Sequence, residues 1–171
     1  MKKLLRTALL IVALAGCVGP MGSIRDAKDD QVSLVYGYIN GNLGVPNVTL
    51  YNKDSRVLAP WMPGNVPAHT FQSGLVVFDN VPPGEYVIYG FGVGQASYDL
   101  GEQRIHVKVR PGEIKYLGAF RYSHEPGIFS NRFSLARADS PSHRSVLGWA
   151  IEATDGTSWK RNLQKRLREL K

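Results

Sequence analysis

The chain has a single cysteine, Cys17, among its 171 residues, and no long hydrophobic run. One thiol cannot form a disulfide bond within the chain, so a disulfide-stapled scaffold is excluded. The most apolar stretch, Ala8–Leu14, would reach only about 10 Å as a helix, whereas the hydrocarbon core of a bilayer is about 30 Å thick. We therefore expect no lasting membrane span.

Recognisable catalytic clusters are also missing. The histidines are scattered, with neither a cysteine partner nor the spacing of a helical zinc site; they are His69, His106, His124 and His143. The acidic residues are dispersed, so no pair of carboxylates indicates hydrolysis. No serine stands in a nucleophile-elbow context. We therefore expect a protein that is not an enzyme and that holds neither a metal ion nor a cofactor.

What the sequence does contain is the composition of a globular β protein. Apolar residues make up 43% and charged residues 20%, which is typical of a folded domain. The 18 glycines, 10 prolines and 8 tyrosines favour frequent turns and strands. The length suits one domain with a sizeable core.

The N-terminus has the layout of a secretory signal, with three bases before the apolar stretch and two small residues before Cys17. Its last residues, Leu14-Ala15-Gly16-Cys17, resemble the lipobox of bacterial lipoproteins. The resemblance implies a signal peptide over residues 1–16, diacylglycerol on the sulfur of Cys17, and acylation of the new N-terminus. An ordinary signal peptide with an incidental cysteine is the alternative.

Lipidation would define the first partner and the location of the protein. Two or three acyl chains on Cys17 hold a protein firmly in a bilayer, so the only prosthetic group we expect is this covalent lipid. Val18 rather than Asp follows the cysteine, which favours the outer membrane, on its periplasmic side, if the source is Gram-negative. Residues 17–31 are rich in glycine and polar side chains and are predicted to form a flexible lipidated tether.

Beyond the tether, the pattern predicts a mainly β fold, a seven-stranded antiparallel sandwich of prealbumin- or Ig-like type over residues 32–136. Ile105–Val109 alternates apolar and polar side chains, as a half-buried strand does. The expected strands are Val32–Ile39, Val48–Tyr51, Leu75–Phe78, Tyr86–Phe91, Ile105–Val109, Ile114–Tyr122 and Ile128–Leu135.

Four segments carry a family resemblance to the carboxypeptidase regulatory-like, prealbumin-like β-sandwiches. They are Val35-Tyr36-Gly37-Tyr38-Ile39, Val45-Pro46-Asn47-Val48-Thr49-Leu50, Phe78-Asp79-Asn80-Val81-Pro82-Pro83-Gly84-Glu85-Tyr86 and Val109-Arg110-Pro111-Gly112-Glu113-Ile114-Lys115-Tyr116. The resemblance spans about residues 32–122. It implies a role in binding or spacing and no particular activity.

The C-terminal segment, residues 142–171, changes to helical periodicity. Ser142 is expected to cap a helix over Arg144–Ala153, and a second helix begins at Thr157 or Ser158. This second helix has an apolar stripe of Trp159, Leu163, Leu167 and Leu170, with bases off the stripe that include Lys160, Arg161, Lys165 and Arg168. Three interpretations stay open: the stripe docks on the sandwich, the helix lies on an anionic membrane surface, or it binds a partner protein.

Charge is concentrated in the same segment. The formal net charge of +7 falls to +4 once the three bases of the signal are removed. Residues 158–171 hold six bases and one acid, or +5, so residues 17–157 carry about −1. The basic character therefore belongs to the tail, and an extracytoplasmic location makes nucleic acid an unexpected partner.

The long polar loop Lys53–Gly74 is the other candidate for function, because loops of this length are uncommon. Trp61 and Phe71 on this loop could stack on a sugar or anchor a partner, or Trp61 could fold back over the sandwich edge. The leading hypothesis is a non-enzymatic scaffold or accessory subunit of a cell-envelope assembly, with an envelope protein as partner. The alternative is a glycan- or polysaccharide-binding lipoprotein module, for which Tyr51 is a further candidate beside Trp61 and Phe71. The candidate binding residues are Trp61, Phe71, Trp159, Arg161, Lys165 and Arg168.

Overall fold

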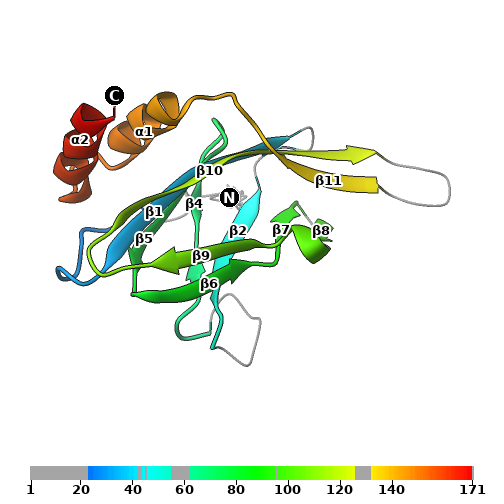
Figure 1. The fold of residues 1–171 in the computed structure, drawn as a ribbon, viewed down its shortest axis with the longest axis horizontal. Coiled ribbons are helices and arrows are strands. Elements are labelled where there is room, and N and C mark those ends of the chain that lie inside the picture. The colour runs from blue at the N-terminus through cyan, green and yellow to red at the C-terminus, as the bar shows by residue number, and fades with distance from the viewer. Residues whose placement is uncertain are drawn as a thin grey trace, which may run out of the picture.

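In the computed structural model, which describes residues 23–41, 44, 46–54, 62–94, 96–125 and 132–170, two β-sheets face each other and two helices cover the first sheet (Figure 1). The interior therefore has two layers. One lies between the sheets, and the other lies between the first sheet and the helices.

The first sheet has the strand order β11-β10-β1-β5-β4. The central strand β1 pairs in parallel with β10 and antiparallel with β5. The bounds are β1 Ser33–Gly41, β4 His69–Thr70, β5 Leu75–Val81, β10 Ile114–Glu125 and β11 Arg132–Arg137.

The second sheet has the order β8-β7-β2-β6-β9, and β3 pairs with β2 off this path. A short 3-10 turn, Gly101–Gln103, follows β8. The bounds are β2 Asn47–Asn52, β3 Val66–Pro67, β6 Gly84–Ile88, β7 Gly90–Val93, β8 Ala96–Asp99 and β9 Ile105–Val109.

Strand β1 is buried on both of its faces because a layer covers each one. Val35 and Ile39 point into the core between the sheets, whereas Tyr36 and Tyr38 point toward the helices. Successive side chains of a strand alternate between faces, so two covered faces explain why an almost unbroken apolar run forms this strand. Gly37 lies where a Cβ would stand 3.0 Å from the carbonyl oxygen of Gly118, so a larger residue would push β10 away.

The two helices dock on the first sheet, and α2 does so through the apolar stripe that the sequence pattern indicated. Helix α1 spans His143–Ala153, and the Ser142 side chain caps it by accepting a hydrogen bond from the Ser145 amide at 3.2 Å. Helix α2 spans Trp159–Glu169. Trp159 is 2% exposed and Leu163 fully buried, in one cluster with side chains of β1, β5 and β10. Of the three interpretations, docking on the sandwich is therefore the one that the structure shows.

The strand count and pairing correct the sequence-based prediction. The described residues form eleven strands in two sheets, and β1 and β10 are parallel, so a seven-stranded antiparallel sandwich was wrong in detail although a sandwich-like class holds. The predicted strand Tyr86–Phe91 is divided at Tyr89 into β6 and β7. Three short strands were missed, two of them, β3 and β4, inside the predicted loop Lys53–Gly74.

The helical layer should contribute much of the stability. Leu163→Ala removes a fully buried side chain and should lower the free energy of unfolding by about 3 kcal/mol. Urea titration followed by far-ultraviolet circular dichroism measures this. Leu167→Ala, on the same helix but only partly buried, is the matched control and should cost about half as much. Equal losses in the two variants would contradict the docking.

Candidate binding surfaces

An N-terminal clasp holds the segment that precedes β1 against the domain. We define the clasp as Arg25–Lys28 together with Asp79 and Asn80 at the end of β5 and Ser158 and Trp159 at the start of α2. Contacts within it join residues more than 50 positions apart in the chain. This clasp fixes where the chain enters the domain.

Asp79 is the electrostatic centre of the clasp. Its side chain is 1% exposed, and it accepts hydrogen bonds from the Arg25 backbone amide at 2.6 Å and from the Arg25 guanidinium at 2.9 Å and 3.3 Å. The imidazole of His69 on β4 lies 3.4 Å from the same carboxylate. Burial alone would raise the pKa of Asp79, but the bonds from His69 and Arg25 outweigh it and hold that pKa well below its usual range. The carboxylate is therefore charged at neutral pH and paired on both sides.

Asn80, the next residue, holds the segment through its amide. Its Nδ2 donates to the carbonyl of Asp26 at 2.9 Å, and its Oδ1 accepts from the amide of Lys28 at 2.8 Å. Asn80 has a φ of +53°, a left-handed conformation that asparagine tolerates better than most residues. In this structure the side-chain amide of Asn80 donates to and accepts from the backbone of the incoming chain, as the backbone of a neighbouring strand would.

Helix α2 completes the clasp from the other side. The indole Nε1 of Trp159 donates to the carbonyl of Arg25 at 2.9 Å, and the amide of Ser158 donates to the carboxylate of Asp26 at 2.6 Å. The Ser158 hydroxyl also accepts from the amide of Ala27 at 3.3 Å. The buried tryptophan thus uses its one polar atom to bind the N-terminal segment, which explains its indole orientation.

The clasp changes the interpretation of the predicted tether. A flexible spacer was expected up to Gln31, but Ile24 is buried in the helix-side cluster and residues 25–28 are hydrogen-bonded to the domain. The glycine and polar content of this segment suggested flexibility. Composition, however, carries no information on contacts with residues far along the chain. Residues 17–22 lie outside the described part, so the prediction is untested there.

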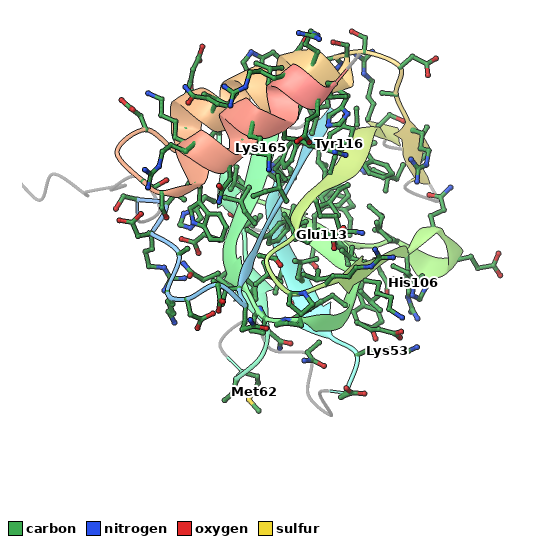
Figure 2. The ribbon with its side chains drawn as sticks, turned by 60° about the vertical axis from the view of Figure 1, so that its left-hand side comes forward. Lys53, Met62, His106, Glu113, Tyr116 and Lys165 are labelled. Atoms are coloured by element: carbon green, nitrogen blue, oxygen red, sulfur yellow. The ribbon has the colours of Figure 1, made fainter. Side chains whose placement is uncertain are left out.

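The exposed side of α2 forms a basic face. The helix carries five bases and one acid, and Arg161, Lys165 and Arg168 are exposed. Figure 2 shows Lys165 on this helix at one end of the molecule, with Met62 and Lys53 at the opposite end. Basic charge therefore gathers at the end where the N-terminal segment is clasped.

A groove lined by tyrosines, of about 320 Å³, lies on the second sheet, on β2, β7 and β8. Its aromatic lining comes from the rings of Tyr51 and Tyr89, whereas the ring of Tyr98 packs on Phe91 against the core between the sheets. The rings of Tyr51 and Tyr89 meet edge to face with centroids 5.7 Å apart, and the guanidinium of Arg104 lies 4.9 Å from the Tyr89 ring centroid. Polar side chains at the groove come from Asn47, Thr49, Ser97 and Asp99. We call this the tyrosine groove.

The structure separates the residues that the sequence suggested for binding. Cys17 and Trp61 lie outside the described residues. Phe71 is partly buried and packs against the helix-side cluster, as Trp159 does more completely, so neither is a freely presented aromatic. The exposed bases of α2 share one helix but lie in a different layer from the tyrosine groove.

Sequence reasoning missed Asp79, Asn80 and Tyr89. Asp79 and Asn80 appeared in the sequence analysis only within a segment that carries the family resemblance. A usable signal was available, since two polar residues closing the strongly apolar run Leu75–Phe78 need partners if that run is buried. Tyr89 offered no comparable signal of a binding site, because tyrosine is common on strands.

The histidines lie in separate surroundings. His69 contacts Asp79, whereas the Nε2 of His143 lies 2.8 Å from the hydroxyl of Tyr36 and its ring stacks on Tyr116 at 3.9 Å. Burial, with a smaller effect from Arg166, lowers the pKa of His143. In the part of the chain that the structure describes, no group of three or more histidine, cysteine or acidic side chains could hold a metal ion.

Comparisons with known proteins found no match, whether with family models, with curated proteins or with solved structures. Within the described ranges, none of the helices has both the length and the apolar character needed to cross a bilayer.

The clasp predicts how stability depends on pH. The pKa of Asp79 is lower in the folded chain than its unfolded value near 4, so its stabilisation is complete above about pH 4 and is lost as the pH falls further. Asp79→Asn should lower the free energy of unfolding by about 2 kcal/mol at pH 7 and much less at pH 2. Urea titrations at the two pH values measure the difference.

The exposed Glu102→Gln variant is the control for that experiment and should change neither value. Hydrogen exchange offers a second readout, because the amides of Arg25 and Lys28 donate to Asp79 and Asn80 and should lose protection in Asp79→Asn. The same pH dependence in the variant and the parent would argue against the assigned role of this carboxylate.

Proposed function

We propose that this chain is a lipid-anchored protein of the bacterial cell envelope, and that it holds a non-enzymatic β-sandwich module at the membrane as a scaffold or accessory subunit. The observation that carries the proposal is the N-terminal clasp. It binds the segment that begins eight residues after Cys17, the predicted lipid attachment site, and so couples the anchor to the folded domain.

The clasp limits how far the domain can stand from the bilayer. Between Cys17 and Arg25 there are eight residue steps, which span at most about 28 Å when fully extended. A flexible tether up to Gln31 would have allowed roughly 20 Å more by the same measure. The clasp therefore gives the module a short reach, as expected for a protein that positions something close to a membrane surface.

The basic face of α2 gives the module a preferred orientation. Trp159 and Ser158, at the start of this helix, contact the incoming segment directly, so the helix lies near the point where the anchor arrives. Arg161, Lys165 and Arg168 then face anionic headgroups, and each base near such a surface contributes about 1 kcal/mol. The end that carries Lys53 and Met62 points away from the bilayer, where an envelope partner can reach it (Figure 2).

Lipidation is tested first. The mature product should start at Cys17 and carry the mass of two or three fatty acyl chains and a glycerol, and it should sediment with membranes. Cys17→Ser should be released into the soluble fraction or remain as an uncleaved precursor, because the thiol that accepts the lipid is gone. Mass spectrometry and membrane fractionation measure this. A mature N-terminus without acyl mass would refute lipid anchoring.

Orientation and partner binding are tested together by photo-crosslinking in cells. A photoreactive residue replacing Asn162, exposed on α2, should crosslink to lipid, whereas one replacing Asp54, beside Lys53, should crosslink to an envelope protein. Reversing Arg161, Lys165 and Arg168 to glutamate should reduce the lipid crosslinks at position 162 and leave those at position 54 unchanged. Recovery of the protein alone from both positions would refute the scaffold role.

A further inference from the structure

We propose that the tyrosine groove is a carbohydrate-binding site, which takes one or two rings of a neutral glycan. The inference goes beyond membrane anchoring and does not depend on it, because no residue of the groove belongs to the clasp or to α2. The groove includes Tyr51, which the glycan hypothesis from the sequence also named, and does not include Phe71.

The groove is built on the outer face of the second sheet. On β2, Val48 and Leu50 point into the core, so the alternating residues Asn47, Thr49 and Tyr51 point to the opposite face. On β7, Phe91 points into the core, and its neighbours Gly90 and Gly92 line the groove. Glycines on this face leave the space open between the side chains of β2 and β8.

The two glycines have different structural roles. A Cβ on Gly90 would stand 2.2 Å from the carbonyl oxygen of Tyr98, so the close pairing of β7 with β8 requires glycine there. A Cβ on Gly92 would meet nothing closer than 3.5 Å, and the φ of Gly92 is not in the left-handed range. Packing therefore does not require glycine at position 92, and its effect is to leave the floor of the groove empty.

The lining has the chemistry that a sugar needs. A pyranose presents C–H groups on its faces and hydroxyls around its edge, so it is bound by aromatic rings together with hydrogen-bonding side chains. Tyr51 and Tyr89 supply partly exposed rings, each with a polar hydroxyl. Asn47, Thr49 and Ser97 supply donors and acceptors from two strands on either side.

The rim of the groove is held in place before any ligand arrives. The carboxylate of Asp99 accepts a hydrogen bond from the Gly101 amide at 2.7 Å and lies 4.0 Å from the Arg104 guanidinium. Arg104 also covers one side of Tyr89. Because the acid and the base offset each other, the groove is close to neutral, which favours an uncharged glycan over a phosphate or a polyanion. A volume of about 320 Å³ is at the small end of ligand sites and fits one or two sugar rings.

The test is titration calorimetry on the full mature protein in a detergent whose headgroup is not a sugar. The probes are a panel of oligosaccharides built from glucose, galactose, mannose and N-acetylglucosamine, together with acidic uronate oligomers and a short peptide mixture as comparisons. We expect millimolar to micromolar binding of at least one neutral oligosaccharide. No binding of any neutral glycan, or preference for the uronates or the peptides, would overturn the proposal.

Two variants locate the binding site. Tyr89→Ala removes a ring and Gly92→Val fills the floor of the groove, and each should weaken binding at least tenfold. His106→Ala, on β9 and outside the groove, is the control and should bind like the parent. If Tyr89→Ala fails to fold by circular dichroism, Gly92→Val decides. Binding unchanged in a folded Gly92→Val variant would overturn the assignment of the site.

The outcome is independent of the anchor. Cys17→Ser, which should lose the membrane, should keep the affinity of the parent for the oligosaccharide. Loss of glycan binding with membrane attachment intact would therefore refute only the groove, and loss of attachment with binding intact would refute only the lipoprotein proposal.

Discussion

The buried carboxylate of Asp79 is the interaction on which the arrangement of the whole module depends. A charge with 1% of its side chain exposed is costly unless it is paired, and here the guanidinium of Arg25 pairs with it from the incoming chain, while the imidazole of His69 on the neighbouring strand lies 3.4 Å away. Because Arg25 belongs to the incoming chain, the carboxylate at the end of β5 would lose its cationic partner without the N-terminal segment. One buried charge thereby couples the core of the first sheet to the path of the chain toward its proposed anchor.

Much of the secondary structure was predictable from local pattern. Ile105–Val109 matches its predicted bounds, because it alternates cleanly and one of its faces is solvated. Helix α1 and the Ser142 cap were found from a polar residue placed before an apolar periodic run. The two-residue strands β3 and β4 were not predictable, since they exist only through pairing with β2 and β5. Parallel pairing of β1 with β10 likewise joins residues about 80 positions apart, and no local pattern reports it.

The candidate sites divide in the same way. The basic face of α2 was evident from helical periodicity, and the burial of Trp159 and Leu163 agrees with the stripe. The tyrosine groove was not predictable, because it forms only when three strands lie side by side. Its empty floor also depends on which face of the sheet Gly92 occupies. Composition alone predicted a flexible tether. The contacts that hold it, of Ala27 with Ser158 and of Arg25 with Trp159, span more than 130 positions, so local sequence does not report them.

The parallel pairing of β1 with β10 and the hydrogen bond from Trp159 to Arg25 also constrain the order in which the chain can fold. A chain that emerges from its N-terminus delivers β1 first, yet β1 stays without its β10 neighbour until residues 114–125 have emerged. The contact of the N-terminal segment with Trp159 can form only after α2 has emerged. Contacts of such long sequence separation form slowly, and β1 exposes an apolar strand in the meantime. Strand β1 can pair with β5 once residue 81 is present, but nearly the whole polypeptide must be present before β1 has both of its neighbours and its helical cover.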